Sequence, residues 1–443
     1  MRRKARESVA RLALLASVAL AGPAGAVASA LKPGLAAGGE AILYTFTGGT
    51  ADGAEPAGGV VRDSAGNLYG TTYWGGGTGC NYGYGCGTVF RIDPSGTETI
   101  LHKFSGADDG GIPNGGLTLD SKGNLYGTTS FGGDLPACGA FGYKGCGVVF
   151  KLNPAGNETV LYTFTGRKDG GWPVHERLLR DSVGNLYGTA EIGGDLNCIP
   201  TQGIGCGVVF RLGADGTYTV LHAFKGNAKD GYAPVSGVVQ DAAGNLFGET
   251  PYGGAGGQGT VYRVTADGRE HVLHMFTGGT DGGYPSGGEL VIDAGGRLYG
   301  TASQGGNLSA CGGVGCGVVF RMTRRGTEKI LYAFRNGLNG STDGAYPREG
   351  VVLDAGGRIF GATEGGGAGG FGMVFALSKT APGNFVESVL HDFTDGADGA
   401  YPTGENLIVG PTGKLYGVAE RGGDADCVQG SPYGCGVVFA LKP

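Results

Sequence analysis

The residues best suited to chemistry stand where a recurring pattern in this chain is interrupted. Most copies of the pattern have a small, aromatic or proline residue after a Gly-Thr-Thr or similar run, but three copies have glutamates: Glu191, Glu364 and Glu420. Paired carboxylates, or a carboxylate beside a histidine, can act as general acid and base on a glycosidic or lactone bond. Glu191, Glu364, Glu420 and His175 are therefore the candidate catalytic residues.

A second set of charged residues replaces small residues that follow a recurring proline. These residues belong to the third, sixth and seventh copies: His175, Glu176, Arg177, Arg348, Glu349 and Glu405. The fifth copy adds Glu289. We expect these positions to meet with the three glutamates in one sector of one face. Two interpretations stay open: a site that binds or cleaves a sugar, and solvated loop charge or structural ion pairs.

The proline belongs to an Asp-Gly-x-x-Pro motif that occurs seven times. The residue before proline is aromatic in four copies: Trp172, Tyr284, Tyr346 and Tyr401. Such rings could stack on sugars, and the aspartates could hold calcium. The alternative, which we favour, is that each Asp closes a turn and each aromatic packs between units. No metal site or other cofactor is expected, and calcium is the one ion left open.

These motifs are placed by a tandem repeat centred on stretches such as Asp-Ser-Lys-Gly-Asn-Leu-Tyr-Gly-Thr-Thr (120–129). Its aromatic recurs every 52 to 61 residues: Tyr69, Tyr126, Tyr187, Phe247, Tyr299, Phe360 and Tyr416. Each unit has four short runs with strand periodicity; in the second unit they are 116–120, 124–129, 147–152 and 158–164. Seven units of four antiparallel strands predict an all-β, seven-bladed β-propeller. An open β-solenoid or a pair of sandwiches is the alternative.

The ends of the chain fit a closed ring. Residues 40–46 form a fourth strand without the first three, and residues 436–441 form a third strand without a fourth. Pairing between them would seal the sheet edges. We therefore expect 40–443 to be one propeller domain and the protein to be a monomer.

Four histidines occupy a slot of the outermost strand that is tyrosine in the other units: His102, His222, His274 and His391. They recur with the repeat, so we interpret them as structural.

The ten cysteines form five local pairs, each between the second and third strands of one unit. We predict five disulfides: Cys80–Cys86, Cys138–Cys146, Cys198–Cys206, Cys311–Cys316 and Cys427–Cys435. An even count in an exported protein indicates disulfides. No pair has Cys-x-x-Cys spacing or an accompanying histidine, which disfavours zinc at these cysteines.

Export is predicted from the N-terminus. Residues 1–6 are basic, residues 12–21 are apolar, and small-x-small cleavage sites follow at 24–26 and 28–30. This pattern is typical of a secretory signal peptide (1–30), here followed by a short linker (31–39). A secreted or periplasmic protein without a membrane span after cleavage is expected. The net charge of −6 without a basic patch argues against nucleic-acid binding.

The ordered motifs Gly-Asn-Leu-Tyr-Gly-Thr-Thr, Gly-x-Val-Phe-Arg/Lys-Leu, Leu-Tyr-x-Phe-Thr-Gly and Asp-Gly-x-x-Pro resemble the GloVer tandem-repeat family of bacterial exported proteins. The blades also resemble those of NHL and gluconolactonase-type propellers, which makes 116–120 the innermost strand and 158–164 the outermost. The GloVer resemblance implies secretion and a repeat β-architecture, and it brings no catalytic residues. The chain ends at Pro443 directly after a strand, so we expect no C-terminal anchor.

Two functional classes follow. The favoured one is a secreted, non-catalytic propeller that binds a glycan or a protein on its top face, the face of the blade-to-blade loops. The alternative is a secreted hydrolase or lyase that acts on a polysaccharide or lactone through carboxylates of units 3, 6 and 7. The regularity of the repeat favours binding over catalysis.

Overall fold

The computed structural model describes residues 39–80, 83–133, 138, 144–173, 177–198, 200–201, 203–285, 288–335, 342–381, 383–423, 426–427 and 433–443. The chain divides into Met1–Lys32 and Pro33–Pro443, and every described residue belongs to the second unit. The predicted signal peptide and its linker up to residue 38 lie outside the described residues.

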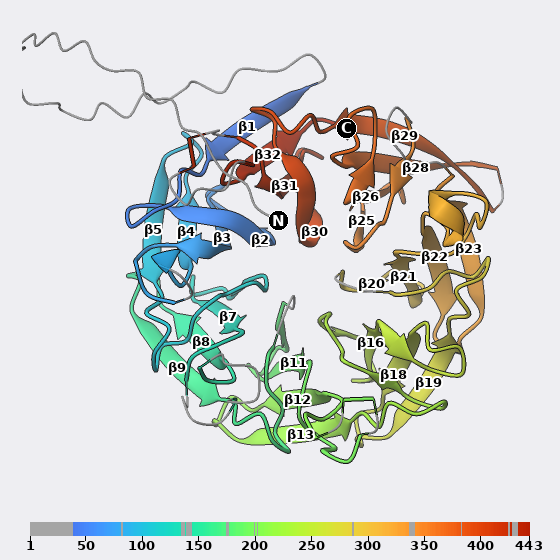
Figure 1. The fold of residues 1–443 in the computed structure, drawn as a ribbon, viewed down its shortest axis with the longest axis horizontal. Helices are drawn as coiled ribbons and strands as arrows, with labels where there is room; N and C mark the ends of the chain where they lie inside the picture. Colours follow the sequence, from blue (N-terminus) through green and yellow to red (C-terminus); the bar gives the residue numbers. More distant parts are fainter. Residues whose placement is uncertain are drawn as a thin grey trace, which may run out of the picture. The chain divides into compact units, whose positions relative to one another are not determined.

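Seven four-stranded antiparallel sheets form a ring, which confirms the predicted seven-bladed β-propeller (Figure 1). In blades 1 to 6 the strands follow chain order from the axis outward. Blade 1 consists of β2 (Gly53–Arg62), β3 (Leu68–Gly75), β4 (Thr88–Ile92) and β5 (Glu98–Lys103). Blade 2 consists of β6 (Thr118–Leu119), β7 (Leu125–Thr129), β8 (Val148–Leu152) and β9 (Glu158–Thr163). Blade 3 consists of β10 (Leu179–Arg180), β11 (Leu186–Ala190), β12 (Val208–Leu212) and β13 (Tyr218–Ala223).

Blade 4 consists of β15 (Val239–Gln240), β16 (Leu246–Thr250), β18 (Thr260–Val264) and β19 (Glu270–Met275), and blade 5 of β20 (Val291–Ile292), β21 (Arg297–Ala302), β22 (Val318–Thr323) and β23 (Glu328–Ala333). Blade 6 consists of β25 (Val351–Leu353), β26 (Ile359–Thr363), β28 (Met373–Ala381) and β29 (Asn384–Asp392). Blade 7 consists of β30 (Ala400–Val409), β31 (Leu415–Arg421), β32 (Val437–Leu441) and β1 (Glu40–Thr45). Two short ladders pair β14 (Gly231–Tyr232) with β17 (Tyr252–Gly253) and β24 (Gly344–Ala345) with β27 (Gly365–Gly366). The described part of the chain has one 3₁₀ turn, η3 (Cys311–Gly313), and no helix long and apolar enough to cross a bilayer.

The N-terminal strand closes the ring as predicted. β1 pairs antiparallel with β32 from Glu40↔Leu441 to Thr45↔Val437. The next residue extends the pairing, because the Phe46 N–H donates to the carbonyl of Gly436 (3.0 Å). Blade 7 is thus built from both ends of the described chain.

The repeated ten-residue stretch is a hairpin built around its aspartate. The Asp120 carboxylate accepts hydrogen bonds from the main-chain N–H of Lys122 and Asn124, from the Asn124 amide and from the Tyr126 hydroxyl. One carboxylate thereby fixes the turn between β6 and β7 and places the aromatic of the next strand. The recurrence of Asp, Asn and Tyr in the sequence reflects this local geometry.

Neighbouring blades are joined by one main-chain hydrogen bond at the residue before the motif proline. In blade 3 the Trp172 N–H donates to the carbonyl of Cys146 in blade 2 (2.9 Å). All seven donors have positive φ values, between 52° and 59°. The seven donor–acceptor pairs are Glu55–Cys435, Ile112–Cys86, Trp172–Cys146, Ala233–Cys206, Tyr284–Gln258, Tyr346–Cys316 and Tyr401–Phe371.

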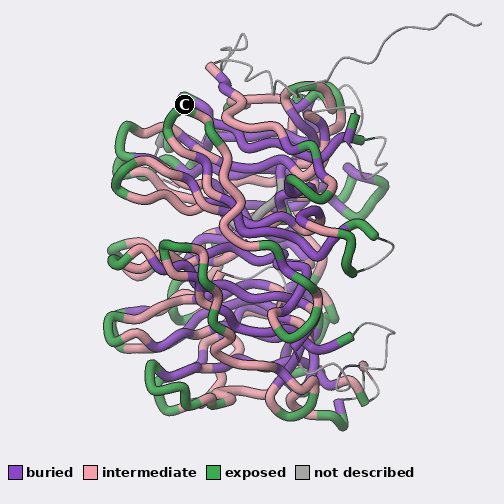
Figure 2. The backbone as a smooth tube through the Cα atoms, turned by 90° about the vertical axis from the view of Figure 1, so that its left-hand side faces the viewer, coloured by how far each residue is buried: buried purple, intermediate pink, exposed green. Residues whose placement is uncertain are grey.

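The same interfaces bury aromatic pairs. A phenylalanine after each outer strand packs edge-on against an aromatic in the third strand of the following blade, as in Phe164–Phe210 at 5.4 Å between ring centroids. Both of these side chains are fully buried. Figure 2 shows the buried residues concentrated within the blades and the exposed ones at the turns. With this edge-to-face packing, each blade interface has its own buried apolar cluster.

The innermost strands are shorter than predicted. In the second unit the sequence predicted a strand over 116–120, whereas β6 contains only Thr118 and Leu119. The reason is that segments before these strands bond to a neighbouring blade instead. The Thr71 hydroxyl of blade 1, for example, donates to the carbonyl of Gly115 in blade 2 (3.0 Å). Only β2 and β30, where the ring closes, reach ten residues.

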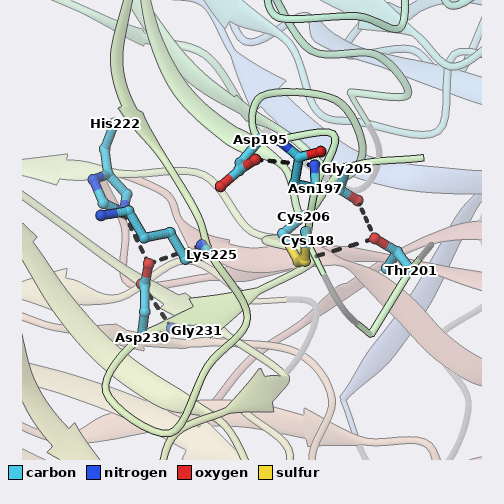
Figure 3. Close-up of a disulfide and its surroundings, with 10 residues drawn as sticks. All are labelled: Asp195, Asn197, Cys198, Thr201, Gly205, Cys206, His222, Lys225, Asp230 and Gly231. Atoms are coloured by element: carbon cyan, nitrogen blue, oxygen red, sulfur yellow. Dashed lines mark hydrogen bonds and ion pairs between the residues drawn. A yellow bond between two sulfur atoms is a disulfide. The ribbon is translucent and has the colours of Figure 1, made fainter. Parts of the chain in front are cut away.

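All five predicted disulfides are present. Each spans five to eight residues and closes the loop between the second and third strands of its blade. In blade 3 the loop is also held by the Thr201 hydroxyl, which donates to the carbonyl of Gly205 (2.8 Å; Figure 3). The second cysteine of each pair supplies the carbonyl that bonds to the next blade.

We expect Gly259→Ala to destabilise the protein by about 3 kcal/mol or more, because a methyl group there would wedge blades 4 and 5 apart. Gly259 has φ +98°, and a Cβ would lie 2.6 Å from Cδ of Pro285 and 2.4 Å from the carbonyl of Thr250. Gly216→Ala is the matched control, since Gly216 also has positive φ (+84°) but no atom within 4 Å of the added Cβ. It should cost about 1 kcal/mol. If chemical denaturation showed that Gly259→Ala and Gly216→Ala lose equal unfolding free energy, the close packing of Gly259 against Pro285 would not matter for stability.

Candidate functional site

The charged residues that the structure brings together lie where blades 6, 7 and 1 adjoin. The Arg348 Nε is 2.7 Å from Oε2 of Glu364. Glu420 interacts electrostatically with Glu364, Arg421 and Glu55. With Tyr401, which lies 5.3 Å below the Arg421 guanidinium, we call these residues the junction cluster: Glu55, Arg348, Glu364, Tyr401, Glu420 and Arg421.

Two equivalent slots of each blade position these side chains. The first slot precedes the motif proline, and the second follows the Gly-Thr-Thr run. They face each other in the ladder: the Glu364 N–H donates to the carbonyl of Tyr346 (3.1 Å), and Glu420 stands opposite Tyr401. The repeat thus sets an aromatic residue beside each of these glutamates.

Blade 1 reverses the arrangement. Glu55 occupies the first slot, and the register of β2 and β3 places Tyr73 opposite it in the second. Trp74 also donates a hydrogen bond to Glu55. Three adjacent blades therefore each present one carboxylate and one aromatic residue.

Burial perturbs two carboxyls of the junction cluster. It raises the pKa of Glu55 to about 7, and the negative charge of Glu420 adds to the effect. Burial also raises the pKa of Glu420, with the Arg421 guanidinium opposing the shift and Glu364 adding to it. Near neutral pH the Glu55 carboxyl can therefore either donate or accept a proton.

Glu191 is separate from this cluster. It occupies the second slot of blade 3, where its N–H donates to the carbonyl of Trp172 (3.1 Å). Burial alone raises the pKa of Glu191, and no other described charge contributes. The candidate glutamates are thus divided, with Glu364 and Glu420 together and Glu191 apart.

Of the remaining charged candidates, Arg177 is placed away from the junction cluster. Arg177 interacts electrostatically with Glu289, across blade 4, and its main-chain N–H donates to the Glu289 carboxylate. Burial raises the pKa of Glu289, and Arg177 opposes the shift. The carbonyl of Glu349 accepts a hydrogen bond from the Thr301 hydroxyl of blade 5 (2.8 Å). His175, Glu176 and the side chain of Glu405 lie outside the described residues.

The candidate aromatics pack between blades. Trp172 lies edge-on to Phe131 of blade 2, and Tyr284 lies edge-on to Tyr252 of blade 4. Tyr401 likewise meets Phe371 of blade 6. All are half-buried, so each combines interblade packing with a partly accessible ring.

The motif aspartates hold their own loops. Asp52 accepts hydrogen bonds from the Thr47 N–H (2.8 Å), the Thr47 hydroxyl (2.9 Å) and the Tyr44 hydroxyl (3.1 Å). Asp169 bonds in the same way to Thr165 and Tyr162. This geometry agrees with the turn-closing interpretation of the motif.

Two carboxylates of interest escaped the sequence analysis. Glu55 occupies the position before the motif proline, where four copies of the repeat have an aromatic residue. It is the one charged residue among the seven at this position, and that difference was the signal in the sequence. Glu249 replaces the first threonine of the Gly-Thr-Thr run in blade 4, a position that in blade 1 bonds to the next blade. Glu249 is 2% exposed, and burial raises its pKa well above the usual range.

The chain matches the family model of the Gloeobacter/Verrucomicrobia repeat over residues 24–203 and 200–430. No curated protein is detectably similar in sequence. A fungal alcohol oxidase of the AA5 family, solved with copper, is similar in structure with TM-score 0.54 and 14% identity, covering 90% of this chain and 75% of that chain.

The extracellular domain of a candidate hybrid two-component system from B. thetaiotaomicron has TM-score 0.51 and 11% identity, covering 90% of this chain and 40% of that chain. A candidate gluconolactonase has TM-score 0.41 and 14% identity, covering 94% and 96%. At such identities, structural likeness concerns the fold and not the activity.

We expect Glu55→Gln to remove part of the pH dependence of stability. The pKa of Glu55 is raised from 4.5 to about 7 on folding, so its contribution to stability is complete below pH 4.5 and is lost as the pH rises through 7. Between pH 4.5 and 8 the wild type should lose on the order of 2 kcal/mol more unfolding free energy than Glu55→Gln. Urea denaturation at a series of pH values measures the difference, and identical profiles would contradict the shift.

Proposed function

The chain belongs to the Gloeobacter/Verrucomicrobia repeat family, and from this membership we propose that it is an exported, non-catalytic propeller that binds a glycan on its top face over blades 6, 7 and 1. The observation that carries the proposal is the junction cluster. Carboxylates from three adjacent blades, each beside an aromatic residue, gather where the repeat departs from its pattern.

The chemistry of the cluster suits a polyhydroxylated ligand. Carboxylates accept hydrogen bonds from sugar hydroxyls, and the guanidinium groups of Arg348 and Arg421 donate to hydroxyl or carboxylate oxygens. Half-buried rings such as Tyr401 supply flat apolar surface beside these groups. The pairing of one carboxylate with one aromatic on successive blades would allow a chain of sugar units to be contacted at repeated points.

Export and a monomeric state belong to the same proposal. Five disulfides suit an oxidising compartment, either the periplasm or the surrounding medium. β1 completes blade 7, so every blade has four strands and the ring exposes only the short edges of its individual blades, which do not require a partner.

One observation favours a second function, a hydrolase or lyase acting on a bound polysaccharide or lactone. Glu55 and Glu420 influence each other electrostatically, and burial raises the pKa of both. Environments that alter the pKa values of neighbouring carboxyls are common at acid–base sites. In this alternative Glu55 would act as the proton donor and Glu420 as its partner.

A glycan array with the oxidised, signal-cleaved protein, with and without calcium, tests the proposal. Glu420→Gln and Tyr401→Ala should each weaken binding by about tenfold or more, because each removes a contact to the ligand. Glu191→Gln and Trp172→Ala change the same two slots in blade 3 and should leave binding unchanged. Equal losses from both pairs, or no glycan binding, would contradict the proposal and turn the search to protein ligands.

Turnover separates the two functions. Incubation of a bound glycan with wild type and Glu55→Gln, followed by measurement of new reducing ends or unsaturated products, should show no cleavage by either protein. Cleavage by the wild type that is lost in Glu55→Gln would establish the enzyme instead.

A further inference from the structure

The outer rim of the ring has a side-chain cluster at each blade interface, centred on the motif Asp that stands three residues before the first slot of the junction cluster. Each contains the motif Asp, a Tyr or His from the preceding outer strand and, at six of the seven interfaces, a Glu from the following outer strand; we call these the outer-rim triads. In three of them a tyrosine hydroxyl donates to the aspartate: Tyr44–Asp52 (3.1 Å), Tyr162–Asp169 (2.9 Å) and Tyr332–Asp343 (3.3 Å). A neutral hydroxyl donor therefore satisfies this position structurally.

The triad of Glu40, His391 and Asp398 is arranged differently. His391 Nε2 lies 3.3 Å from Oε1 of Glu40 and 3.3 Å from Oδ2 of Asp398, and the three atoms all lie within 4.8 Å of one another. Glu40 is 1% exposed, and neither its Oε1 nor His391 Nε2 has a hydrogen-bond partner. A buried carboxylate oxygen and a buried imidazole nitrogen are thus directed at a common point, in ion-pair contact but without a hydrogen bond of good geometry. The equivalent nitrogens of His102, His222 and His274 also lack such a hydrogen bond, so it is the convergence of three ligand atoms that sets this triad apart from those of His102 and His274.

Two hydrogen bonds from Thr394 orient the Asp398 carboxylate toward the same point. Its Oδ2 accepts a hydrogen bond from the Thr394 N–H (3.0 Å), and its Oδ1 accepts one from the Thr394 hydroxyl (2.5 Å). These bonds fix the orientation of the carboxylate and leave a lone pair on Oδ2. Second contacts of this kind orient the ligands of metal sites.

The two 3.3 Å separations from His391 Nε2 match the edges of a metal coordination sphere. Zinc bonds of about 2.0–2.2 Å in tetrahedral geometry place ligand atoms about 3.3–3.5 Å apart. We propose that Glu40, His391 and Asp398 bind a divalent first-row transition metal ion, represented by Zn²⁺, through one imidazole nitrogen and two carboxylate oxygens. A fourth position remains for water.

The other histidine triads are less suited to a cation. Among the described residues, only the group of His222, Asp230 and Glu270 converges comparably. There, the positive charge of Lys225 acts on Glu270, whereas the Lys225 N–H donates to the Asp230 carboxylate just as the Thr394 N–H donates to Asp398 (Figure 3). The His102 and His274 triads do not bring three ligand atoms within the same distance.

The site has a structural consequence because Glu40 lies on β1. Glu40 belongs to the strand that closes blade 7, whereas His391 lies on β29 of blade 6. A bound ion would join these two blades at the point where the N-terminal strand completes the ring. Metal binding should therefore stabilise the closed ring, independently of any glycan.

Zinc titration of the tag-free, oxidised full chain after EDTA treatment and dialysis tests the inference. Calorimetry and elemental analysis after gel filtration should find one tightly bound Zn²⁺ per chain and a higher melting temperature with zinc. His391→Tyr should weaken zinc binding more than tenfold and abolish the thermal shift, yet it should fold, because tyrosine occupies this slot in three other blades. Glu40→Gln is the second test and preserves side-chain shape.

His274→Tyr is the matched control and should bind zinc like the wild type. Absence of stoichiometric zinc binding by the wild type would overturn the inference. Binding that survives in both His391→Tyr and Glu40→Gln would overturn it as well. Glycan binding by the junction cluster is expected to persist in His391→Tyr, so the failure of either proposal can be recognised without the other.

Discussion

The ring depends on one main-chain hydrogen bond repeated at all seven blade interfaces. The residue before the motif proline takes a positive φ and donates its N–H to the blade behind it. Non-glycine residues adopt this conformation at a cost of about 1–3 kcal/mol, so the surrounding structure must enforce it. Enforcement comes from the glycine that opens the third strand: the next blade's proline packs against it so closely that no Cβ would fit.

Because this bond uses only main-chain atoms, the side chain at the same position is free to vary. The seven residues include a glutamate, an isoleucine, a tryptophan, an alanine and three tyrosines. The interaction that holds the ring together therefore also supplies seven variable positions beside the loops of the top face. The junction cluster uses this freedom at Glu55 and Tyr401, while the opposing slots contribute Glu364 and Glu420.

The features that the sequence predicted correctly are those set by local geometry. The Asp120 hairpin, the short cysteine loops and the unmatched strands at the two ends each leave a signature within a few residues, so blades, disulfides and ring closure could be inferred. Side-chain encounters between blades leave no such signature. Glu55 lies near Glu420, and Arg177 approaches Glu289 across blade 4. Both encounters depend on how each blade is rotated relative to its neighbours, and the residue spacing of the repeat does not determine that rotation. The short inner strands were missed for the same reason, since carbonyl groups before them accept hydrogen bonds from a neighbouring blade.

Hydrogen exchange of the seven donor amides, measured by mass spectrometry before and after mild reduction, tests this account most directly. Reduction must be performed where circular dichroism shows the strands intact. Exchange should accelerate by about tenfold or more at the five amides whose acceptor is a cystine carbonyl, because reduction frees that loop. These are Glu55, Ile112, Trp172, Ala233 and Tyr346. Exchange at Tyr284 and Tyr401, which bond to Gln258 and Phe371, should stay unchanged. Uniform acceleration at all seven amides, or none at any, would contradict an account in which each interblade bond is an independent contact whose acceptor is steadied by its own loop.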